Sequence, residues 1–559
     1  MTRAALAVAV VLLAHAPHNP ARAQADSTLI RRVDSVLAPW RHDDSPGCAL
    51  GVDRDGAPLL RRAVGMANLE AGSRWTIGTI SESGSVAKQF VAAGLVLLAL
   101  DGKLSLDQDI SRWIPEVRGI GRRITVRHLL NHTSGLPDRY LLHEVEGRPA
   151  GEVDHPNTEV MHVVSRLRDL NFDPGDDYLY SNTGYVVAVA VLERVSGRSL
   201  QQLTAERIFR PLGMTSTRWR EDHRVVVPGR AAAYSGTRAR GFRNDHPFTR
   251  VFGSGGLLTT VDDFLRWQAA LQRGGAWGAV RDSLEVVGRL NDETVLTYGL
   301  GVGVSRWRGL RVVSHTGSTG GYRAALLRYP ERDVAIALLC NVGSINPAVL
   351  ARHVAEAVLD GVLAAADPEP QPINPDPARL AALAGVYHSP RTEEVLVLSV
   401  RDGQLLDGST RLIPVAPDRF RFPTGNASLV VLSSGTGVPP GLRIESPGSR
   451  TVEYVPVAPP RLDAARLASY AGSYRSPELG AEYQLALERD TLRLLRAWRP
   501  PLALVPLHDD GFRVEGASRL RFLRGPDGAV TGFTIWAGRV RHLRFDRVAE
   551  GAVAGGRSR

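Results

Sequence analysis

Two side chains near the start of the chain have the types and spacing of an activated nucleophile. Ser85 and Lys88 lie three residues apart in the stretch "SESGSVAKQF". Lys88 and Lys103 are the only lysines among 68 basic residues, so all the others are arginine. Arginine carries charge as well as lysine does, but it stays protonated in proteins. We therefore infer that Lys88 exchanges a proton with Ser85, whose hydroxyl would be the nucleophile.

The element that must position this pair is a buried helix. Residues 86–100 are apolar except for Lys88, Gln89 and Gly94, a pattern typical of a helix that is buried on nearly every side. Ser85 would lie in its first turn, with Lys88 one turn further on the same face. Apolar surroundings lower the pKa of a lysine, and a helix N-terminus favours negative charge on the serine.

Two later stretches have polar residues at the ends of predicted elements. "FDPGDDYLYSNTGYVVAVAVLERVSG" runs from a turn-rich loop into a helix, with Tyr180 and Asn182 at the junction. "VVSHTGSTGGYRAALLRYPERDVAIALLCNVG" reads as a strand that contains His315, a glycine-rich step, and a hairpin turning at "PERD". Taken singly, Tyr180 could be an interface aromatic and Asn182 a helix cap.

Together, these motifs resemble those of the penicillin-recognising serine hydrolases. Ser-x-x-Lys, Tyr-x-Asn and His-Thr-Gly occur in the order of the class C β-lactamase, D,D-peptidase and esterase branch. "ITVRHLLNHTSGLPD", "IFRPLGMTSTRW" and "GSGGLLTTVDDFLRW" extend the resemblance over residues 30–345. It implies an α+β fold, an antiparallel sheet flanked by helices with a helical subdomain. It also implies an enzyme that needs no cofactor and no metal.

The resemblance assigns roles to individual residues. Ser85 would form an acyl-enzyme, while Lys88 and Tyr180 would share the proton transfers, with the Tyr180 hydroxyl as general base and later acid. Asn182 would bind the amide of the substrate, and the backbone N–H groups of Ser85 and Ser318 would form an oxyanion hole. The substrate-binding residues implied in this way are Asn182, His315, Gly317 and Ser318.

The third motif departs from the β-lactamase pattern. His315 stands where classical β-lactamases have lysine, and an unperturbed histidine is mostly neutral at pH 7. Such a residue is a poor cation for the carboxylate of a β-lactam. The motif favours esters, amides or amino-acid derivatives without that carboxylate. We therefore expect small-molecule or peptide substrates with ester or amide bonds, including D-amino-acid or peptidoglycan-related ones. The alternatives are a β-lactamase, or a penicillin-binding sensor that is acylated once and does not turn over.

The C-terminal third contains an internal duplication. "RLAALAGVYHSP" begins at Arg379 and "RLASYAGSYRSP" begins at Arg466, with eight identities in twelve positions. Each copy continues as short alternating strands, which predicts two small antiparallel β-barrels or sandwiches. A catalytic domain followed by two barrels resembles the layout of bacterial D-aminopeptidases. In the last copy "GPDG" at 525–528 is either a hairpin turn or a loop that brings Asp527 to a substrate amine.

A chain of 559 residues is too long for a single core. Five prolines between 368 and 377 indicate a stiff linker. The predicted segments are a signal peptide at 1–25, the hydrolase domain at 26–366, the linker at 367–378, and barrel repeats at 379–458 and 463–548.

The N-terminal residues indicate where the protein acts, and the net charge bears on whether it binds nucleic acid. Arg3, an apolar run and "ARAQA" form an export signal, with cleavage expected after Ala23 or Ala25. The apolar run is too short for a stable membrane span. We expect a bacterial protein that is periplasmic or secreted. Its net charge of +10 accompanies no nucleic-acid recognition motif, so nucleic acid is not an expected partner.

One pair of cysteines and one pair of histidines are interpreted as structural. Cys48 and Cys340 both lie in strand-like runs, which predicts buried free thiols, with a single disulfide as the alternative in an oxidising compartment. His128 and His132 have the spacing of a zinc pair, but no third ligand accompanies them. We expect them to be structural histidines.

Overall fold

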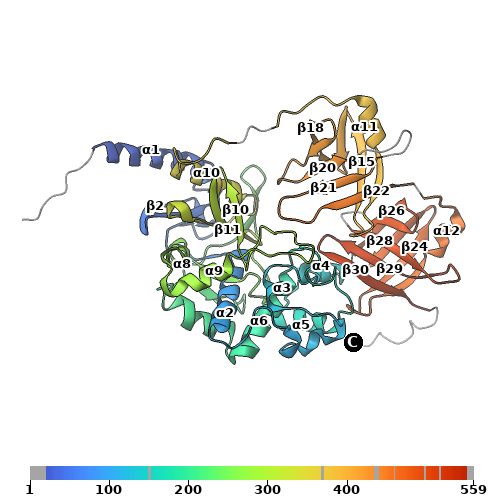
Figure 1. The fold of residues 1–559 in the computed structure, drawn as a ribbon, viewed down its shortest axis with the longest axis horizontal. Helices are drawn as coiled ribbons and strands as arrows, with labels where there is room; N and C mark the ends of the chain where they lie inside the picture. Colours follow the sequence, from blue (N-terminus) through green and yellow to red (C-terminus); the bar gives the residue numbers. More distant parts are fainter. Residues whose placement is uncertain are drawn as a thin grey trace, which may run out of the picture.

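The computed structural model describes residues 20–148, 153–366, 370–432, 440–458, 460–496, 499–514 and 518–549. Its first domain (Figure 1) is built on one six-stranded antiparallel sheet. The strand order of this sheet is β10-β11-β12-β13-β1-β2. The strands are β1 Cys48–Arg54, β2 Ala57–Val64, β10 Gly303–Trp307, β11 Leu310–Thr319, β12 Tyr322–Tyr329 and β13 Val334–Cys340.

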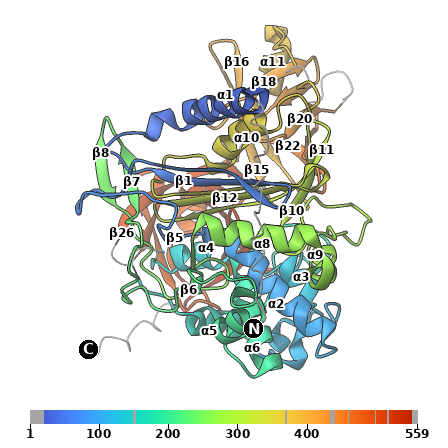
Figure 2. The same cartoon turned by 90° about the vertical axis from the view of Figure 1, so that its left-hand side faces the viewer.

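Helices cover both faces of this sheet (Figure 2). Helices α1 Pro20–Leu37 and α10 Pro347–Val358 pack on one face, and α8 Val261–Arg273 packs on the other. Every residue of β13 is buried, as expected for a strand with apolar partners on both sides. Two small two-stranded sheets, β3-β4 and β7-β8, and one three-stranded sheet, β5-β9-β6, complete the domain. Their strands are β3 Met66–Asn68, β4 Ser73–Arg74, β5 Ser81–Glu82, β6 Arg218–Trp219, β7 Tyr234–Thr237, β8 Gly241–Asn244 and β9 Leu257–Thr259.

A helical subdomain lies between β5 and β10 in the chain. Its helices are α2 Lys88–Leu100, α3 Val126–Leu130, α4 Arg139–Val145, α5 Asn157–Arg166, α6 Asn182–Ser196, α7 Leu200–Thr204 and α9 Gly278–Leu284. The predicted apolar helix is α2, and it packs against α6 and α7 with ten of its residues buried. The expected α+β architecture is confirmed.

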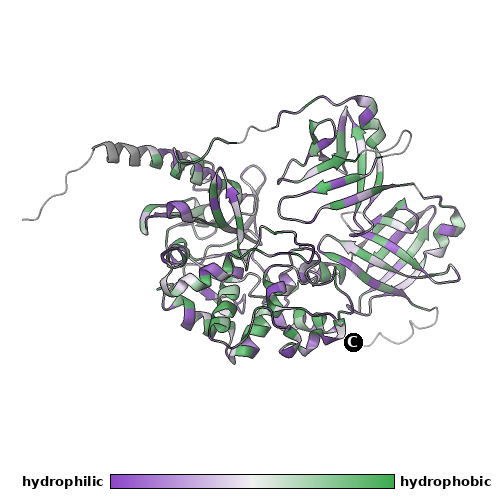
Figure 3. Cartoon of the chain, in the orientation of Figure 1, coloured by the Kyte–Doolittle hydropathy of each residue, from purple (hydrophilic) through white to green (hydrophobic). Residues whose placement is uncertain are grey.

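The two copies of the repeat form barrel-like sheets with similar beginnings. In each, a short helix leads into a strand, and a tyrosine hydroxyl donates to a carbonyl four residues earlier: Tyr387 to Leu383 at 3.1 Å and Tyr474 to Tyr470 at 2.8 Å. Along their strands hydrophobic and hydrophilic residues alternate (Figure 3), which places one face of each strand in a barrel core.

The first sheet is nearly closed and the second is fully closed. Nine strands of the first run in the order β17-β16-β15-β14-β22-β21-β20-β19-β18, whereas β23 to β30 form a closed barrel of eight. The first copy comprises α11 Pro377–Leu383, β14 Gly385–His388, β15 Val395–Arg401, β16 Gln404–Asp407, β17 Thr410–Arg411, β18 Ile413–Ala416, β19 Arg419–Arg421, β20 Ser428–Val431, β21 Leu442–Glu445 and β22 Val452–Val457. The second comprises α12 Ala464–Ser469, β23 Gly472–Arg475, β24 Glu482–Glu488, β25 Thr491–Arg496, β26 Arg499–His508, β27 Gly511–Val514, β28 Arg519–Arg524, β29 Val530–Ala537 and β30 Val540–Arg547.

A buried carboxylate joins the three domains. Asp177, in the loop before α6, lies 2.8 Å from Arg391 of the first barrel and 3.3 Å from Arg541 of the second. Arg541 also lies 3.4 Å from Glu394 of the first barrel. The second barrel therefore packs beside α4 and the helical subdomain (Figure 1).

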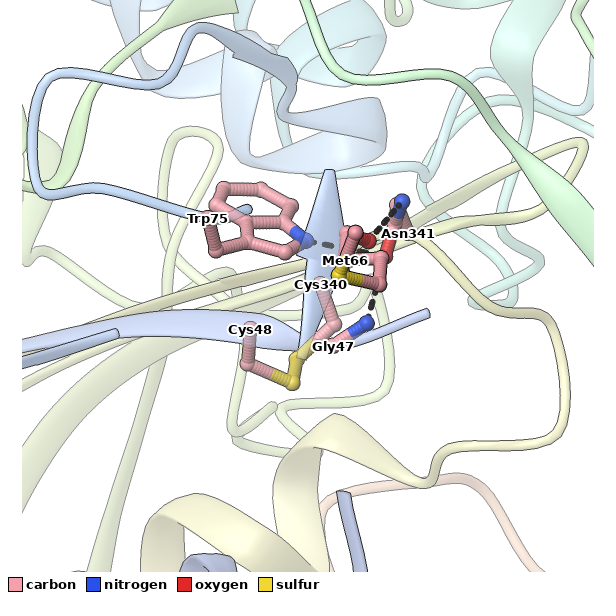
Figure 4. The surroundings of a disulfide bond; sticks show 6 residues. All are labelled: Gly47, Cys48, Met66, Trp75, Cys340 and Asn341. Atoms are coloured by element: carbon pink, nitrogen blue, oxygen red, sulfur yellow. Dashed lines mark hydrogen bonds between the residues drawn. A yellow bond between two sulfur atoms is a disulfide. The ribbon is translucent and has the colours of Figure 1, made fainter. Parts of the chain in front are cut away.

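The two cysteines form a disulfide, so the expectation of buried free thiols is wrong. Cys48 on β1 and Cys340 on β13 are directly opposite, with their Cα atoms 4.1 Å apart. This antiparallel pairing brings together residues separated by 292 positions in the chain. Beside the bond, the side chain of Asn341 accepts from the N–H of Gly47 and the indole of Trp75 (Figure 4).

Most of the predicted export signal lies outside the described residues, and residues 20–25 belong to α1. Among the helices that the structure describes, none is long and apolar enough to cross a membrane.

Candidate active site

Ser85 and Lys88 meet at a tight turn that opens the buried helix. A 3-10 turn, Gly84–Ala87, precedes α2, which itself begins at Lys88. In a 3-10 turn the side chains of residues i and i+3 are eclipsed. The Lys88 Nζ consequently lies 3.1 Å from the Ser85 Oγ. The predicted helix thus begins with a turn that is wound more tightly than an α-helical turn. This geometry brings the Ser85 hydroxyl and the Lys88 amine into contact.

The amine of Lys88 is surrounded by acceptors in a buried position. Its Nζ lies 2.9 Å from Asn182 Oδ1 and 2.6 Å from the carbonyl oxygen of Ser254. Burial lowers the pKa of Lys88 well below its usual value, and the nearby Asp138 offsets this only in part. A neutral amine has two N–H donors and one lone pair. In that form the Asn182 and Ser254 oxygens would use the two donors, and the lone pair would be left for the hydroxyl of Ser85.

Tyr180 lies beside the amine as a protonated phenol. The Lys88 Nζ is 4.7 Å from the centroid of its ring. Burial raises the pKa of Tyr180 well above its usual value, and the neighbouring Ser85 hydroxyl lowers it by less. The buried Tyr180 hydroxyl makes no well-formed hydrogen bond to any residue that the structure describes. Its proton is therefore not used in a well-formed hydrogen bond to any described residue.

Asn182 holds the lysine and is itself held by Asp138. Asn182 begins α6, and both its backbone N–H and its Nδ2 lie 2.8 Å from Asp138 Oδ2. This pairing directs the Asn182 Oδ1 toward Lys88. In the structure Asn182 thus positions the Lys88 amine, while its expected contact with the substrate amide stays a prediction. Sequence reasoning did not single out Asp138, although it lies within the "HTSGLPD" stretch.

The edge of β11 passes directly over the catalytic turn. A Cβ on Gly84 would lie 2.5 Å from the backbone nitrogen of Ser318, and one on Gly317 would lie 3.0 Å from that of Ser85. Only glycine permits so close an approach of two backbones. The amides of Ser85 and Ser318 are therefore neighbours, as the predicted oxyanion hole requires.

His315 is neutral and bound within the protein. Burial lowers its pKa to about 4. The Tyr298 hydroxyl lies 2.8 Å from its Nε2, and its Nδ1 lies 2.6 Å from the carbonyl oxygen of Thr316. Since that carbonyl is an acceptor only, Nδ1 carries the proton and Nε2 accepts from Tyr298. His315 thus supplies no positive charge at neutral pH, in line with the expectation from the sequence.

An arginine from the last barrel also reaches the site, and no pattern in the sequence predicted it. Arg539 lies in the turn between β29 and β30, with its Nη1 3.5 Å from Asp138 Oδ2. Its guanidinium carbon is 5.6 Å from the centroid of the Tyr180 ring. The "GPDG" turn behaves differently: Asp527 accepts from the N–H of Ala529 at 3.0 Å and closes the β28–β29 hairpin.

The family model described as Beta-lactamase matches residues 34–361, more than half of the chain. The chain belongs to the beta-lactamase family. Among curated proteins, the D-aminopeptidase of Brucella anthropi is 27% identical over 535 residues, covering 91% of this chain and 97% of the relative. The D-aminopeptidase of Brucella melitensis is 26% identical over 530 residues, covering 90% and 96%. Both barrels therefore fall within the similarity.

Solved structures of the beta-lactamase fold agree. The octameric penicillin-binding protein homologue from Pyrococcus abyssi superposes with a TM-score of 0.53 at 20% identity, covering 85% of this chain and 98% of that one. The D-amino acid amidase from Ochrobactrum anthropi SV3, complexed with D-phenylalanine, gives a TM-score of 0.51 at 23% identity, covering 59% and 98%. With these relatives, this member of the beta-lactamase family is a serine hydrolase.

The two histidines with zinc-like spacing have structural roles in this family member. His128 accepts from the N–H of Thr125 through Nδ1, and its own N–H donates to the Thr125 hydroxyl, which forms a capping box for α3. His132 accepts from the N–H of Ser181 at 3.1 Å and stacks on Tyr180 with ring centroids 4.0 Å apart. Within the described residues no cluster of His, Cys, Asp or Glu is arranged to hold a metal.

Proposed function

We propose that this serine hydrolase cleaves D-amino-acid amides and short peptides through an acyl-enzyme on Ser85. The observation that carries the proposal is the buried amine of Lys88, whose pKa is lowered by that burial and whose Nζ lies 3.1 Å from the Ser85 hydroxyl. The D-aminopeptidase relatives, matched along nearly their whole length, support this substrate class. Ester hydrolysis by the same machinery is a second activity to test.

Acylation begins with proton transfer from Ser85 to Lys88, so that Lys88, rather than Tyr180 as expected from the sequence, is the proposed base. As the Ser85 Oγ attacks the carbonyl carbon of the substrate, its proton moves to the Lys88 Nζ. The ammonium that forms is stabilised by the oxygens of Asn182 and Ser254, which already contact it. The oxyanion would be bound by the backbone N–H groups of Ser85 and Ser318, an element whose loss costs ~3–4 kcal/mol per donor in other enzymes.

Tyr180 serves the leaving nitrogen. Since burial keeps its hydroxyl protonated, Tyr180 donates that proton as the C–N bond breaks, and it is reprotonated from the Lys88 ammonium. The proton lost by Ser85 thereby ends on the released amine. Water then attacks the ester of Ser85 by the reverse sequence, giving the free acid and restoring the serine.

The neutral His315 argues against recognition of a β-lactam carboxylate through the third motif. In β-lactamases a lysine at this place supplies a cation, whereas His315 has a pKa lowered to about 4 by burial. We also propose that the protein acts outside the cytoplasm. The export-signal pattern at residues 1–25 and the Cys48–Cys340 disulfide support this location, because disulfides persist in oxidising compartments.

Steady-state hydrolysis tests the proposal. The purified protein and a Ser85→Ala variant would be compared on D-alanine p-nitroanilide, a D-Ala-D-Ala peptide, p-nitrophenyl butyrate and nitrocefin. We expect turnover of the D-alanine substrates that the Ser85→Ala substitution abolishes. A single stoichiometric labelling by a fluorescent penicillin, without turnover of any substrate, would instead identify a penicillin-binding sensor.

A further inference from the structure

The β29–β30 turn is held in place at the active site. The carbonyl oxygen of Arg539 accepts from Asn171 Nδ2 at 3.0 Å and from the N–H of Asp138 at 3.1 Å. The N–H of Arg541 donates to Asn171 Oδ1 at 2.7 Å. Three hydrogen bonds between the catalytic domain and this turn therefore fix the backbone from which the Arg539 side chain projects.

The guanidinium of Arg539 has unused donors. It carries five N–H groups, yet its side chain makes no hydrogen bond within the part of the chain that the structure describes, and its nearest carboxylate oxygen, on Asp138, lies 3.5 Å away. About a third of the side chain is exposed, 34% by area. A substrate group can consequently reach it.

The surroundings contain more positive than negative charge. Asp138 is fully buried and already accepts from the N–H of Tyr140 and from Asn182. Its neighbour Arg139 is only 2% exposed, and its Nε and Nη1 have no partner among the described residues, although the guanidinium stacks 3.8 Å from the Tyr140 ring. Around the Lys88 amine, the guanidinium groups of Arg139 and Arg539 therefore outnumber the carboxylate of Asp138. An anionic ligand would balance this excess.

The position of Arg539 indicates which half of the substrate carries that anion. Arg539 lies over Tyr180, the residue that donates a proton to the leaving nitrogen in the proposed mechanism. In a leaving amino acid the α-carboxylate is only two bonds from that nitrogen. A guanidinium binds a carboxylate through two parallel hydrogen bonds, which gives directional selectivity.

We propose that Arg539 is a specificity-determining residue that binds the free carboxylate of the leaving amino acid. The enzyme would therefore favour dipeptides over the matching dipeptide amides. This inference rests on the proposed function, since it names the leaving group of that reaction. It also gives the second barrel a role in substrate selection.

Two substrates that differ only at the terminal group provide the test: D-alanyl-D-alanine and D-alanyl-D-alaninamide share the same scissile bond. We expect the wild-type kcat/KM to be about tenfold or more higher for the carboxylate, the typical size of a charged hydrogen bond. In Arg539→Gln this ratio should fall to near one. Arg544→Gln removes an exposed arginine of β30 that pairs with Asp546 and should keep the wild-type ratio.

Further measurements separate the outcomes. A wild-type ratio at or below one, or a ratio unchanged in Arg539→Gln, would overturn the role of Arg539 while the hydrolase function stands. If the wild type cleaves neither substrate, the proposed function itself fails. Calorimetry with the Ser85→Ala variant needs no turnover and should show tighter binding of the carboxylate. If Arg539→Gln does not fold, Arg539→Lys keeps a charge beside Asp138 and should still lower the ratio severalfold.

Discussion

The Nζ of Lys88 lies 2.6 Å from the backbone carbonyl oxygen of Ser254, a residue 166 positions later in the chain. Gly253, just before it, has φ +93° and lies against α6, where a Cβ would be 2.3 Å from Val189. The loop can approach the helix so closely because this position has no side chain. The orientation of the catalytic amine thus depends on a backbone segment packed from elsewhere in the domain.

Substitution of Lys88 by arginine should abolish activity even if the fold survives. Arginine keeps the positive charge, but it does not give up its proton and so cannot serve as the base for Ser85. We expect kcat/KM to fall by about 10²–10⁴, measured on D-alanine p-nitroanilide. Lys103→Arg is the matched control, because Lys103 is exposed and should tolerate the change. Comparable activity in the two variants would refute the role of Lys88.

The capping box of α3 makes the fold sensitive to acid. Burial lowers the pKa of His128 from 6.5 to about 4, so the unfolded chain binds more protons between these values. The stability that neutral His128 contributes to the fold is therefore fully present above pH 6.5 and is lost as the pH falls toward 4. This loss is at most about 3 kcal/mol. His128→Gln retains the N3 side chain that a capping box uses but does not titrate. Between pH 7 and pH 4.5 the melting temperature should fall less for the variant than for the wild type. An equal fall would show that His128 does not contribute to the acid sensitivity.

Loss of the disulfide should destabilise the catalytic domain. Cys48 and Cys340 close a loop of 292 positions, which restricts the unfolded chain strongly. We expect the double substitution to serine to lower the free energy of unfolding by about 2–5 kcal/mol. The check is denaturant unfolding with and without a reducing agent. Reduction should destabilise the wild type and leave the double variant unaffected, and a wild type that is insensitive to reduction would contradict the assignment.

The junction of the three domains depends on one carboxylate. Asp177→Ala would leave Arg541, which is only 8% exposed, without its nearest partner. Because a buried charge without its partner is unfavourable, we expect a loss of about 3 kcal/mol and faster proteolysis between the domains. Asp173→Ala, in the same loop, removes an exposed pair with Arg122 and should change neither measurement. Equal proteolysis rates in the two variants would show that Asp177 does not stabilise the contact between the domains.

Much of the proposed site could be predicted because its contacts are local. Ser85 and Lys88 meet within a single turn, and Asn182 begins the helix that its own segment predicts. The duplicated barrels were also recognisable, since the two copies share residues and strand patterns. These features depend on short spacing and periodicity, which a sequence displays directly.

Only the tertiary structure decided the rest. The pairing of Cys48 with Cys340, the support of Asn182 by Asp138 and the arrival of Arg539 from the last barrel each join segments far apart in the chain. The lowered pKa of Lys88 belongs with them, because it results from burial by several segments. The sequence by itself determined which residue types were available for catalysis and in which elements. Their protonation and their long-range partners followed from packing, which no local pattern encodes.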